Sequence, residues 1–230
     1  MDKVLKSISQ KIAHRYGFLM PMASIEGLSI FILWLFTVSS LIGISLGYLD
    51  WFITKTPINL MLGFLLVLIN IPFGKKWSKP VFILFFVLGM ALEIAGVVRG
   101  DIFGQYYYGE NLGFKVWGVP LMIGIYWAVL TTVTHQMARV ITRNIFLIAV
   151  TGASLMVGLD VLMEQMAHSF DFWHFTGNFA PFQNYVTWFI AAFVFQLIAY
   201  KFYPKGGSYF ASHLFLNQIA FFLGTFLILN

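Results

Sequence analysis

Three acidic residues lie inside long apolar stretches of this sequence: Glu93, Asp160 and Glu164. An ionised group at the centre of a membrane helix costs about 2.5–3.5 kcal/mol on insertion scales, so acids in such places usually have a function. Asp160 and Glu164 are four residues apart, which places them on one face of a helix, and His168 continues that face one turn later. Two carboxylates one turn apart repel each other when both are ionised, so we expect one to hold a proton at neutral pH. Such a group could carry out acid–base chemistry.

Both parts of this acidic group also have a purely structural explanation. Glu93 could be hydrogen-bonded between helices and only stabilise their packing. The Asp160–Glu164 pair could be solvated at the edge of a membrane, without a chemical role. We interpret both parts as functional, because ionisable residues within membrane helices commonly mark functional sites.

Three glycines lie on approximately the same helix face as Glu93, at positions 89, 96 and 100. Small residues allow a neighbouring helix or a ligand to approach closely. The glycine spacing therefore predicts a close contact beside this acid.

The two longest predicted connections, residues 99–118 and 165–183, have an unusual composition. The first interleaves five glycines with aromatic residues that include Tyr106 and Tyr108, and the second is rich in aromatic residues around Trp173. Aromatic residues are expected at a membrane interface in any case. The close glycine spacing instead suits tightly turned backbone over a cavity. An aromatic-lined cavity can stabilise a cation.

Several familiar chemistries are excluded by composition and spacing. The chain has no Cys, which rules out disulfides, thiolate metal sites and Cys nucleophiles. Its five His residues are scattered, and no motif for nucleotide, dinucleotide or zinc binding occurs. The Lys and Arg residues are spread over short connections rather than gathered on one stripe, so no nucleic-acid partner is expected. We expect acid–base chemistry with no metal and no cofactor.

The elements that position these residues are predicted to be membrane helices. Of the residues, 60% are apolar and only 10% are charged, against about 25% charged in a soluble domain. The composition predicts an all-α, polytopic integral membrane helix bundle, a single transmembrane domain over residues 1–230. Residues 1–20 are expected to form an amphipathic segment at the membrane surface. About seven spans are expected, near 24–47, 57–73, 80–98, 119–138, 144–164, 184–203 and 209–229.

The positions of the basic residues predict the orientation. In a seven-span arrangement, 11 of the 14 Lys and Arg residues lie on the side of the N-terminus. Positively charged connections stay in the cytoplasm, so we expect a cytoplasmic N-terminus and an external C-terminus in a cell membrane. Glu93, Asp160, Glu164 and His168 would then all lie in the outer half of the bilayer.

Several stretches of residues 85–190 together form a recognisable pattern. They are Glu93-Ile-Ala-Gly96, Gly100-x-x-Phe103-Gly104-x-Tyr106-x-Tyr108, Leu112-Gly113, Gly118-Val119-Pro120-Leu121, Trp127, Asp160-x-x-x-Glu164, Trp173 and Pro181-x-x-Asn184-x-x-x-Trp188. This pattern resembles the membrane carotenoid hydratases, the bisanhydrobacterioruberin hydratase and γ-carotene 1′-hydroxylase type of carotenoid biosynthesis protein. The chain departs from the family pattern at Arg99, at Gln165 and around Pro181. The resemblance implies a location in the cell (cytoplasmic) membrane.

The resemblance implies acid-catalysed addition of water to the terminal C1,2 double bond of an acyclic carotenoid end group, which gives a tertiary alcohol. The implied partners are a carotenoid within the lipid bilayer, membrane lipids and possible further carotenoid enzymes. The catalytic residues would be Glu93, Asp160 and Glu164, with either Glu93 or the pair as proton donor. The substrate-binding residues would be Tyr106, Tyr108, Trp127, His168, Trp173 and Asn184.

Three other readings of the same residues remain open. Another carotenoid or polyprenoid end-group enzyme, such as an isomerase or a cyclase-like enzyme, would use the same protonated end group. A pigment-binding protein would hold a polyprenoid without transforming it. A proton-coupled transporter would also use membrane acids, although the sequence shows no inverted repeat.

Overall fold

The computed structural model describes residues 24–177 and 179–230, and this part of the chain is an all-α membrane helix bundle. Five of its helices are long and apolar enough to cross a membrane: α2, α5, α7, α8 and α9. The helices are α2 (Ile25–Ser45), α3 (Leu49–Ile53), α4 (Thr56–Asn70), α5 (Ser78–Arg99), α6 (Leu121–Ile141), α7 (Ile145–Ala167), α8 (Phe182–Phe202) and α9 (Ser208–Leu229).

Each of the seven predicted spans corresponds to a helix whose ends lie within a few residues of the prediction. Two of these seven helices are not among the five that are long and apolar enough to cross a membrane. Helix α4 has only 15 residues, and α6, with 21, carries several polar side chains. The one-turn helix α3 was not predicted. The predicted amphipathic segment 1–20 lies outside the described residues.

Local sequence signals explain where these helices begin and end. The side chain of Ser24 accepts a hydrogen bond from the backbone N–H of Gly27 at the start of α2. The Asn144 side chain accepts from two N–H groups of the first turn of α7. Gly100 ends α5 with φ +69°, a left-handed conformation that disfavours other residues.

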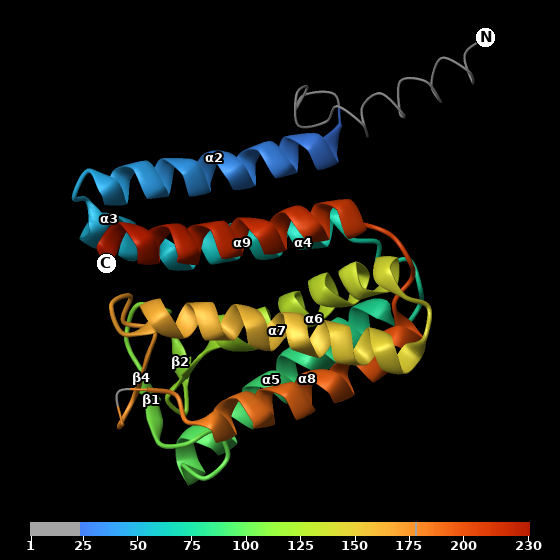
Figure 1. Cartoon of the computed structure of the whole chain (residues 1–230). Helices are drawn as coiled ribbons and strands as arrows, with labels where there is room; N and C mark the ends of the chain where they lie inside the picture. Colours follow the sequence, from blue (N-terminus) through green and yellow to red (C-terminus); the bar gives the residue numbers. More distant parts are fainter. Residues whose placement is uncertain (1–23, 178) are drawn as a thin grey trace.

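Helix α6 lies at the centre of the bundle and packs against α4, α5, α7, α8 and α9 (Figure 1). Most of its buried polar side chains form hydrogen bonds within the protein, although Nε2 of His135 has no partner among the described residues. The hydroxyls of Thr131, Thr132 and Thr134 each donate to the carbonyl four residues earlier. This arrangement explains how a helix with modest hydropathy occupies the most enclosed position.

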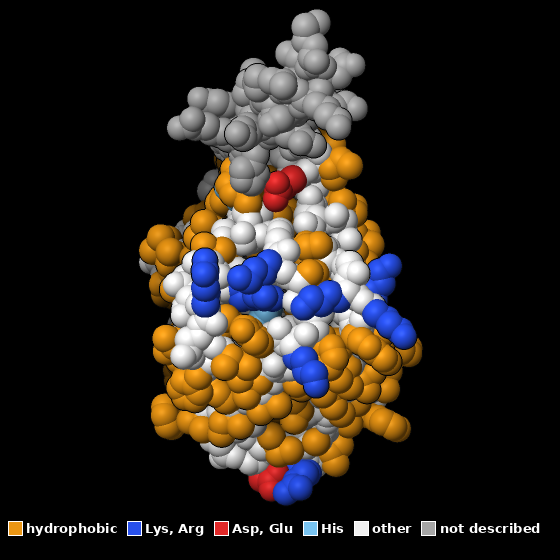
Figure 2. Space-filling model, turned by 90° about the vertical axis from the view of Figure 1, so that its right-hand side faces the viewer, with side chains coloured by type: hydrophobic (Ala, Val, Ile, Leu, Met, Phe, Trp, Pro, Cys, Tyr) orange, Lys and Arg blue, Asp and Glu red, His pale blue; other side chains and the backbone are white. Residues whose placement is uncertain are grey.

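The two ends of the bundle differ in charge and in structure. One end, here called the basic end, carries Lys and Arg side chains on its connections, as the view onto it shows (Figure 2). These residues are Lys75, Lys76, Lys79, Arg139, Arg143, Lys201 and Lys205.

The opposite end, here called the site end, carries four short strands. Strand β1 (Tyr106–Tyr108) pairs antiparallel with β4 (Trp173–Phe175), and β2 (Lys115–Val116) pairs with β3 (Val119–Pro120). The β1–β4 pair, here called the ribbon, joins the two long connections that the sequence singled out. It brings residues nearly 70 positions apart side by side (Figure 1).

Candidate active site

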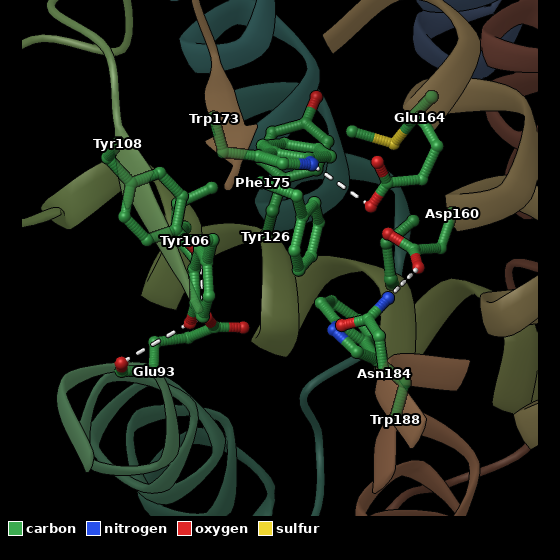
Figure 3. Close-up of a pocket in the computed structure, with 13 residues that line it drawn as sticks. Glu93, Tyr106, Tyr108, Tyr126, Asp160, Glu164, Trp173, Phe175, Asn184 and Trp188 are labelled. Atoms are coloured by element: carbon green, nitrogen blue, oxygen red, sulfur yellow. Dashed lines mark hydrogen bonds between the residues drawn. The ribbon is translucent and has the colours of Figure 1, made fainter. Parts of the chain in front are cut away.

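A small cavity of about 50 Å³ lies beneath the ribbon, between helices α5, α6, α7 and α8 (Figure 3). Carboxyl groups from α5 and α7 reach it from opposite sides, and most of the remaining wall is aromatic or aliphatic. The lining residues are Glu93, Tyr106, Tyr108, Ile123, Tyr126, Leu130, Asp160, Met163, Glu164, Trp173, Phe175, Asn184 and Trp188.

Glu93 projects from α5 and accepts three hydrogen bonds. Its Oε2 atom accepts from the hydroxyls of Tyr106 and Tyr108, at 2.6 and 2.7 Å, and its Oε1 atom accepts from the indole Nε1–H of Trp127, at 2.9 Å. The side chain is buried, so these donors replace the water that a carboxylate would otherwise bind. Because Oε2 already has two donors, a proton on Glu93 would have to be on Oε1.

The strand pattern explains how two tyrosines reach the same oxygen atom. Alternate residues of β1 point inward, so Tyr106 and Tyr108 face the cavity while Tyr107 faces out. Burial raises the pKa of the Tyr106 hydroxyl, and the nearby Glu93 carboxyl raises it further. The pKa of Tyr108 is raised for the same two reasons. Both hydroxyls therefore remain donors at neutral pH.

Two of the three glycines noted beside Glu93 allow its partners to approach. A Cβ at position 89 would lie 2.5 Å from the Cβ of Trp127, and one at position 96 would lie 2.9 Å from the Tyr106 hydroxyl. Real Cβ atoms are essentially never this close to other atoms. The expected close contact is thus present at Gly89 and Gly96, whereas Gly100 serves as the helix terminus.

Asp160 and Glu164 lie on one face of α7, as their spacing predicts, and both line the cavity. Each accepts one side-chain hydrogen bond: Asp160 from the amide of Asn184 at 3.3 Å, and Glu164 from the indole of Trp173 at 3.0 Å. Asp160 is buried and Glu164 is half-buried. The pair therefore has fewer donors than Glu93 alone.

Seven of the nine residues chosen from the sequence line the cavity directly. Trp127 lies behind the wall: it bonds to Glu93 and stacks on Trp188 at 3.9 Å between ring centroids. His168 does not line the cavity. It is exposed and bonds through Nδ1 to Nδ1 of His174 on the outer face of the ribbon.

Three large residues of the wall were not chosen as site residues from the sequence: Tyr126, Phe175 and Trp188, the last of which is among the residues that carry the resemblance. Two of them had a usable signal. Trp188 follows Asn184 by four residues on α8, and Phe175 follows Trp173 by two residues on a strand, so each shares a face with a chosen residue. Tyr126 is adjacent to Trp127 but on a different face of α6.

The geometry is suited to proton transfer within an apolar enclosure. Carboxyl groups on both sides of a small cavity can donate and accept a proton, while the aromatic walls keep out bulk water. Within residues 24–177 and 179–230, no group of three or more His, Asp or Glu side chains is arranged to hold a metal ion.

Comparison with known proteins identifies a family for most of the chain. A sequence model for carotenoid biosynthesis proteins matches residues 55–229, which include every residue that lines the cavity. No curated protein and no solved structure matches the chain. This membrane helix bundle therefore belongs to the carotenoid biosynthesis protein family.

Proposed function

We propose that this protein adds water to the terminal C1,2 double bond of an acyclic carotenoid end group by acid catalysis, giving a tertiary alcohol. The observation that carries the proposal is that Glu93 faces Asp160 and Glu164 across an aromatic-walled cavity, in a carotenoid biosynthesis protein. Both hydrogen atoms and the oxygen of one water enter the product, so the reaction has no redox change.

The first step requires a proton donor. A carboxylic acid transfers its proton to C2, the less substituted carbon of the double bond, and the π electrons form the new C–H bond. Positive charge then develops on the tertiary carbon C1. We assign the donor to the Asp160–Glu164 pair, because two adjacent carboxyl groups with one donor each readily share a proton.

The second step is capture of the cation by water. Water oxygen bonds to C1 and passes its extra proton to a carboxylate, which restores the acid for the next cycle. Asn184 is placed to orient this water, because its amide already contacts Asp160 beside the cavity.

Glu93 is assigned a different role from the pair. Its three donors suit a carboxylate that stays ionised and stabilises the cation through space. The ring faces of Tyr126, Phe175 and Trp188 add a weaker attraction for the same charge. Glu93 would thus be the anion that stabilises the cation, and the Asp160–Glu164 pair would be the acid that donates the proton.

The cavity volume limits what enters it. Pockets for drug-sized ligands measure about 300–1,000 Å³, several times larger than this cavity. We therefore propose that only the end group enters, that wall side chains move to admit it, and that the polyene remains in the lipid. The protein would act in the cytoplasmic membrane, with the site end on the outer side.

The test is expression in a lycopene- or γ-carotene-producing host, followed by liquid chromatography with mass detection. We expect a new pigment heavier by one water, and incorporation of ¹⁸O when purified protein acts in H₂¹⁸O. Asp160→Asn and Glu164→Gln should abolish product, whereas Glu93→Gln should lower the rate while leaving ¹⁸O in any product formed.

The other outcomes distinguish the remaining possibilities. A product of unchanged mass but altered absorption would replace hydration with an isomerase or cyclase-like reaction, in which the same cation loses a proton. An unchanged pigment that copurifies with the protein would indicate binding without reaction. Proton-gradient-dependent uptake into vesicles would indicate transport.

A further inference from the structure

The outer face of the ribbon carries a hydrogen-bonded group that the proposed chemistry does not use. His174 on β4 bonds to His168 at the end of α7, with 2.8 Å between the two Nδ1 atoms, and its Nε2 lies 2.9 Å from Oδ1 of Asp171. Its ring stacks on Tyr107 of β1, with 5.0 Å between centroids. We call His168, Asp171 and His174 the latch.

Asp171 extends the latch to the other strand of the ribbon. Its second oxygen, Oδ2, accepts from the backbone N–H of Glu110, just beyond β1, at 2.7 Å. The space for this carboxylate is left by Gly109, where a Cβ would collide with the Asp171 side chain. Asp171 also has φ +51°, an uncommon conformation that is maintained only when surrounding contacts favour it. The latch therefore joins α7, β4 and the end of β1.

We propose that His174 is a positioning residue for the reaction: through the latch it holds the ribbon closed over the cavity. The inward residues of the same strands are Tyr106 and Tyr108, which bond to Glu93, and Trp173, which bonds to Glu164. Strand geometry couples the two faces, so a change in the outward side chain moves its inward neighbours. This inference rests on the proposed function in the experiment that measures product formation.

The two short nitrogen contacts allow only certain protonation states. A carboxylate can only accept, so Nε2 of His174 donates to Asp171. Between the two Nδ1 atoms there is room for one proton. If both rings are neutral, His168 donates, and if His174 is charged, His174 donates. When both rings are charged, both Nδ1 atoms carry protons, the bond is lost and the like charges repel.

The other charged and titratable groups near the latch do not offset the repulsion between the two histidine rings when both are charged. Burial acts to raise the pKa of Asp171, but hydrogen bonds from His174 and from the backbone outweigh it and hold that pKa below its ordinary value. The carboxylate of Glu110 is paired with Lys115 at 2.7 Å. Glu164, one turn before His168, is bonded to Trp173, and Tyr107 contacts His174 only by stacking.

The latch should therefore be intact with zero or one added proton and open with two. Acid should therefore open the ribbon, because it supplies the second proton that the contact between the two Nδ1 atoms cannot accommodate. Opening would separate the tyrosines from Glu93 and Trp173 from Glu164 at the same time.

The first experiment compares pH profiles of product formation in proteoliposomes. His168→Asn keeps a group that can bond to His174 but cannot become charged, so we expect near-normal rates at pH 7.5 and a smaller loss at pH 5.5 than in the wild type. His168→Arg places a fixed cation against His174, so we expect a roughly three- to tenfold lower rate throughout. Identical profile shapes for the wild type and His168→Asn would overturn the inference, because titration of the cavity carboxyls is common to both.

The second experiment does not depend on activity. The chain has no cysteine, so Met163→Cys introduces a single thiol on the α7 wall of the cavity. Its labelling by a water-soluble maleimide is measured at pH 5.5 and 7.5, relative to Phe114→Cys, an exposed position that corrects for thiol ionisation. We expect the relative rate to rise about fivefold at pH 5.5, and His168→Asn to suppress the rise.

The two experiments separate the two proposals. If the labelling rate of Met163→Cys relative to Phe114→Cys rises at pH 5.5 in a protein that makes no hydrated product, the latch is supported and the function contradicted. If this relative rate is the same at both pH values in an active hydratase, the function is supported and the latch contradicted.

Discussion

At the scale of single residues, the site depends on how closely three donors approach one carboxyl group. The oxygen atoms of Glu93 accept from Tyr106, Tyr108 and Trp127 across two interfaces, one with the ribbon and one with α6. Each contact exists because a glycine or an inward strand position makes room for it. Small changes in side-chain volume beside Glu93 should consequently have large effects.

Gly96→Ala tests this dependence. The added methyl group would collide with the Phe103 ring and lie 2.9 Å from the Tyr106 hydroxyl, so we expect Tyr106 to be displaced and product formation to fall at least about tenfold. Gly158→Ala is the matched control, because a Cβ added at this position of α7 would meet no atom of another described segment within 4 Å. Equal activity of the two variants in the pigment assay would contradict the role given to Gly96.

Tyr108→Phe removes one donor and leaves the ring in place. Tyr106 would still donate to the same oxygen, but a hydrogen bond to a charged group contributes about 1.5–3 kcal/mol, so we expect a lower melting temperature and a slower reaction. Tyr107→Phe, on the outer face of the same strand, should change the melting temperature and the reaction rate by only a small fraction of the changes that Tyr108→Phe causes. Unfolding is followed by the temperature dependence of near-ultraviolet circular dichroism in detergent.

Sequence reasoning singled out residues whose chemistry is unusual for their surroundings, and their roles in a reaction stay predictions. Acids within apolar stretches are conspicuous, and Glu93, Asp160 and Glu164 all line one cavity. His168 was placed with them because it continues the face of α7. One helical turn rises about 5.4 Å, which carries His168 past the cavity to the outer side of the ribbon.

At the scale of elements, the ribbon is the part that the sequence did not reveal. Hydropathy and turn residues located seven helices, because apolar runs of this length are easily recognised in a sequence. Strands of three residues do not. Tyr106, Tyr107 and Tyr108 are chemically identical, so no alternation marks which of them point inward. The resemblance singled out Tyr106 and Tyr108, and the pairing with residues 173–175 supplies the physical reason why these two point inward.

The ribbon should lose stability in acid through Asp171. A carboxyl whose pKa is lower in the folded protein contributes stability that is present above its ordinary pKa, about 3.9, and is lost as the pH falls through the lowered value. Asp171→Asn should therefore increase hydrogen exchange of ribbon amides at pH 7, and the difference from the wild type should disappear in strong acid. Exchange in α6 serves as the internal reference, and a difference that persists undiminished in acid would show that the charge of Asp171 is irrelevant.

At the scale of the whole molecule, charge and chemistry are separated along the bundle axis. The basic end carries Lys and Arg on its connections and the adjoining helix ends (Figure 2), whereas the ribbon lies at the site end (Figure 1) and residues of the ribbon line the cavity. The distribution of positive charge predicts that the basic end stays in the cytoplasm. The cavity would then open toward the outer leaflet.

Single cysteines can test this orientation in intact cells. We expect a membrane-impermeant maleimide to label Phe114→Cys at the site end and to leave Gly74→Cys at the basic end unlabelled until the membrane is permeabilised. Neither substitution removes a basic residue, and position 74 has open space around it. The reverse labelling pattern would place the cavity on the cytoplasmic side.

The position of the cavity near one end of the bundle has a consequence for long substrates. A rod-shaped polyene that spans the bilayer presents one terminus to each leaflet, and a site near one surface reaches only one of them. An acyclic carotenoid with two identical termini would have to leave after the first hydration and turn over in the membrane, carrying a hydroxyl through hydrocarbon, before its second terminus could react. The enzyme would then work distributively, and the singly modified pigment would accumulate before the doubly modified one.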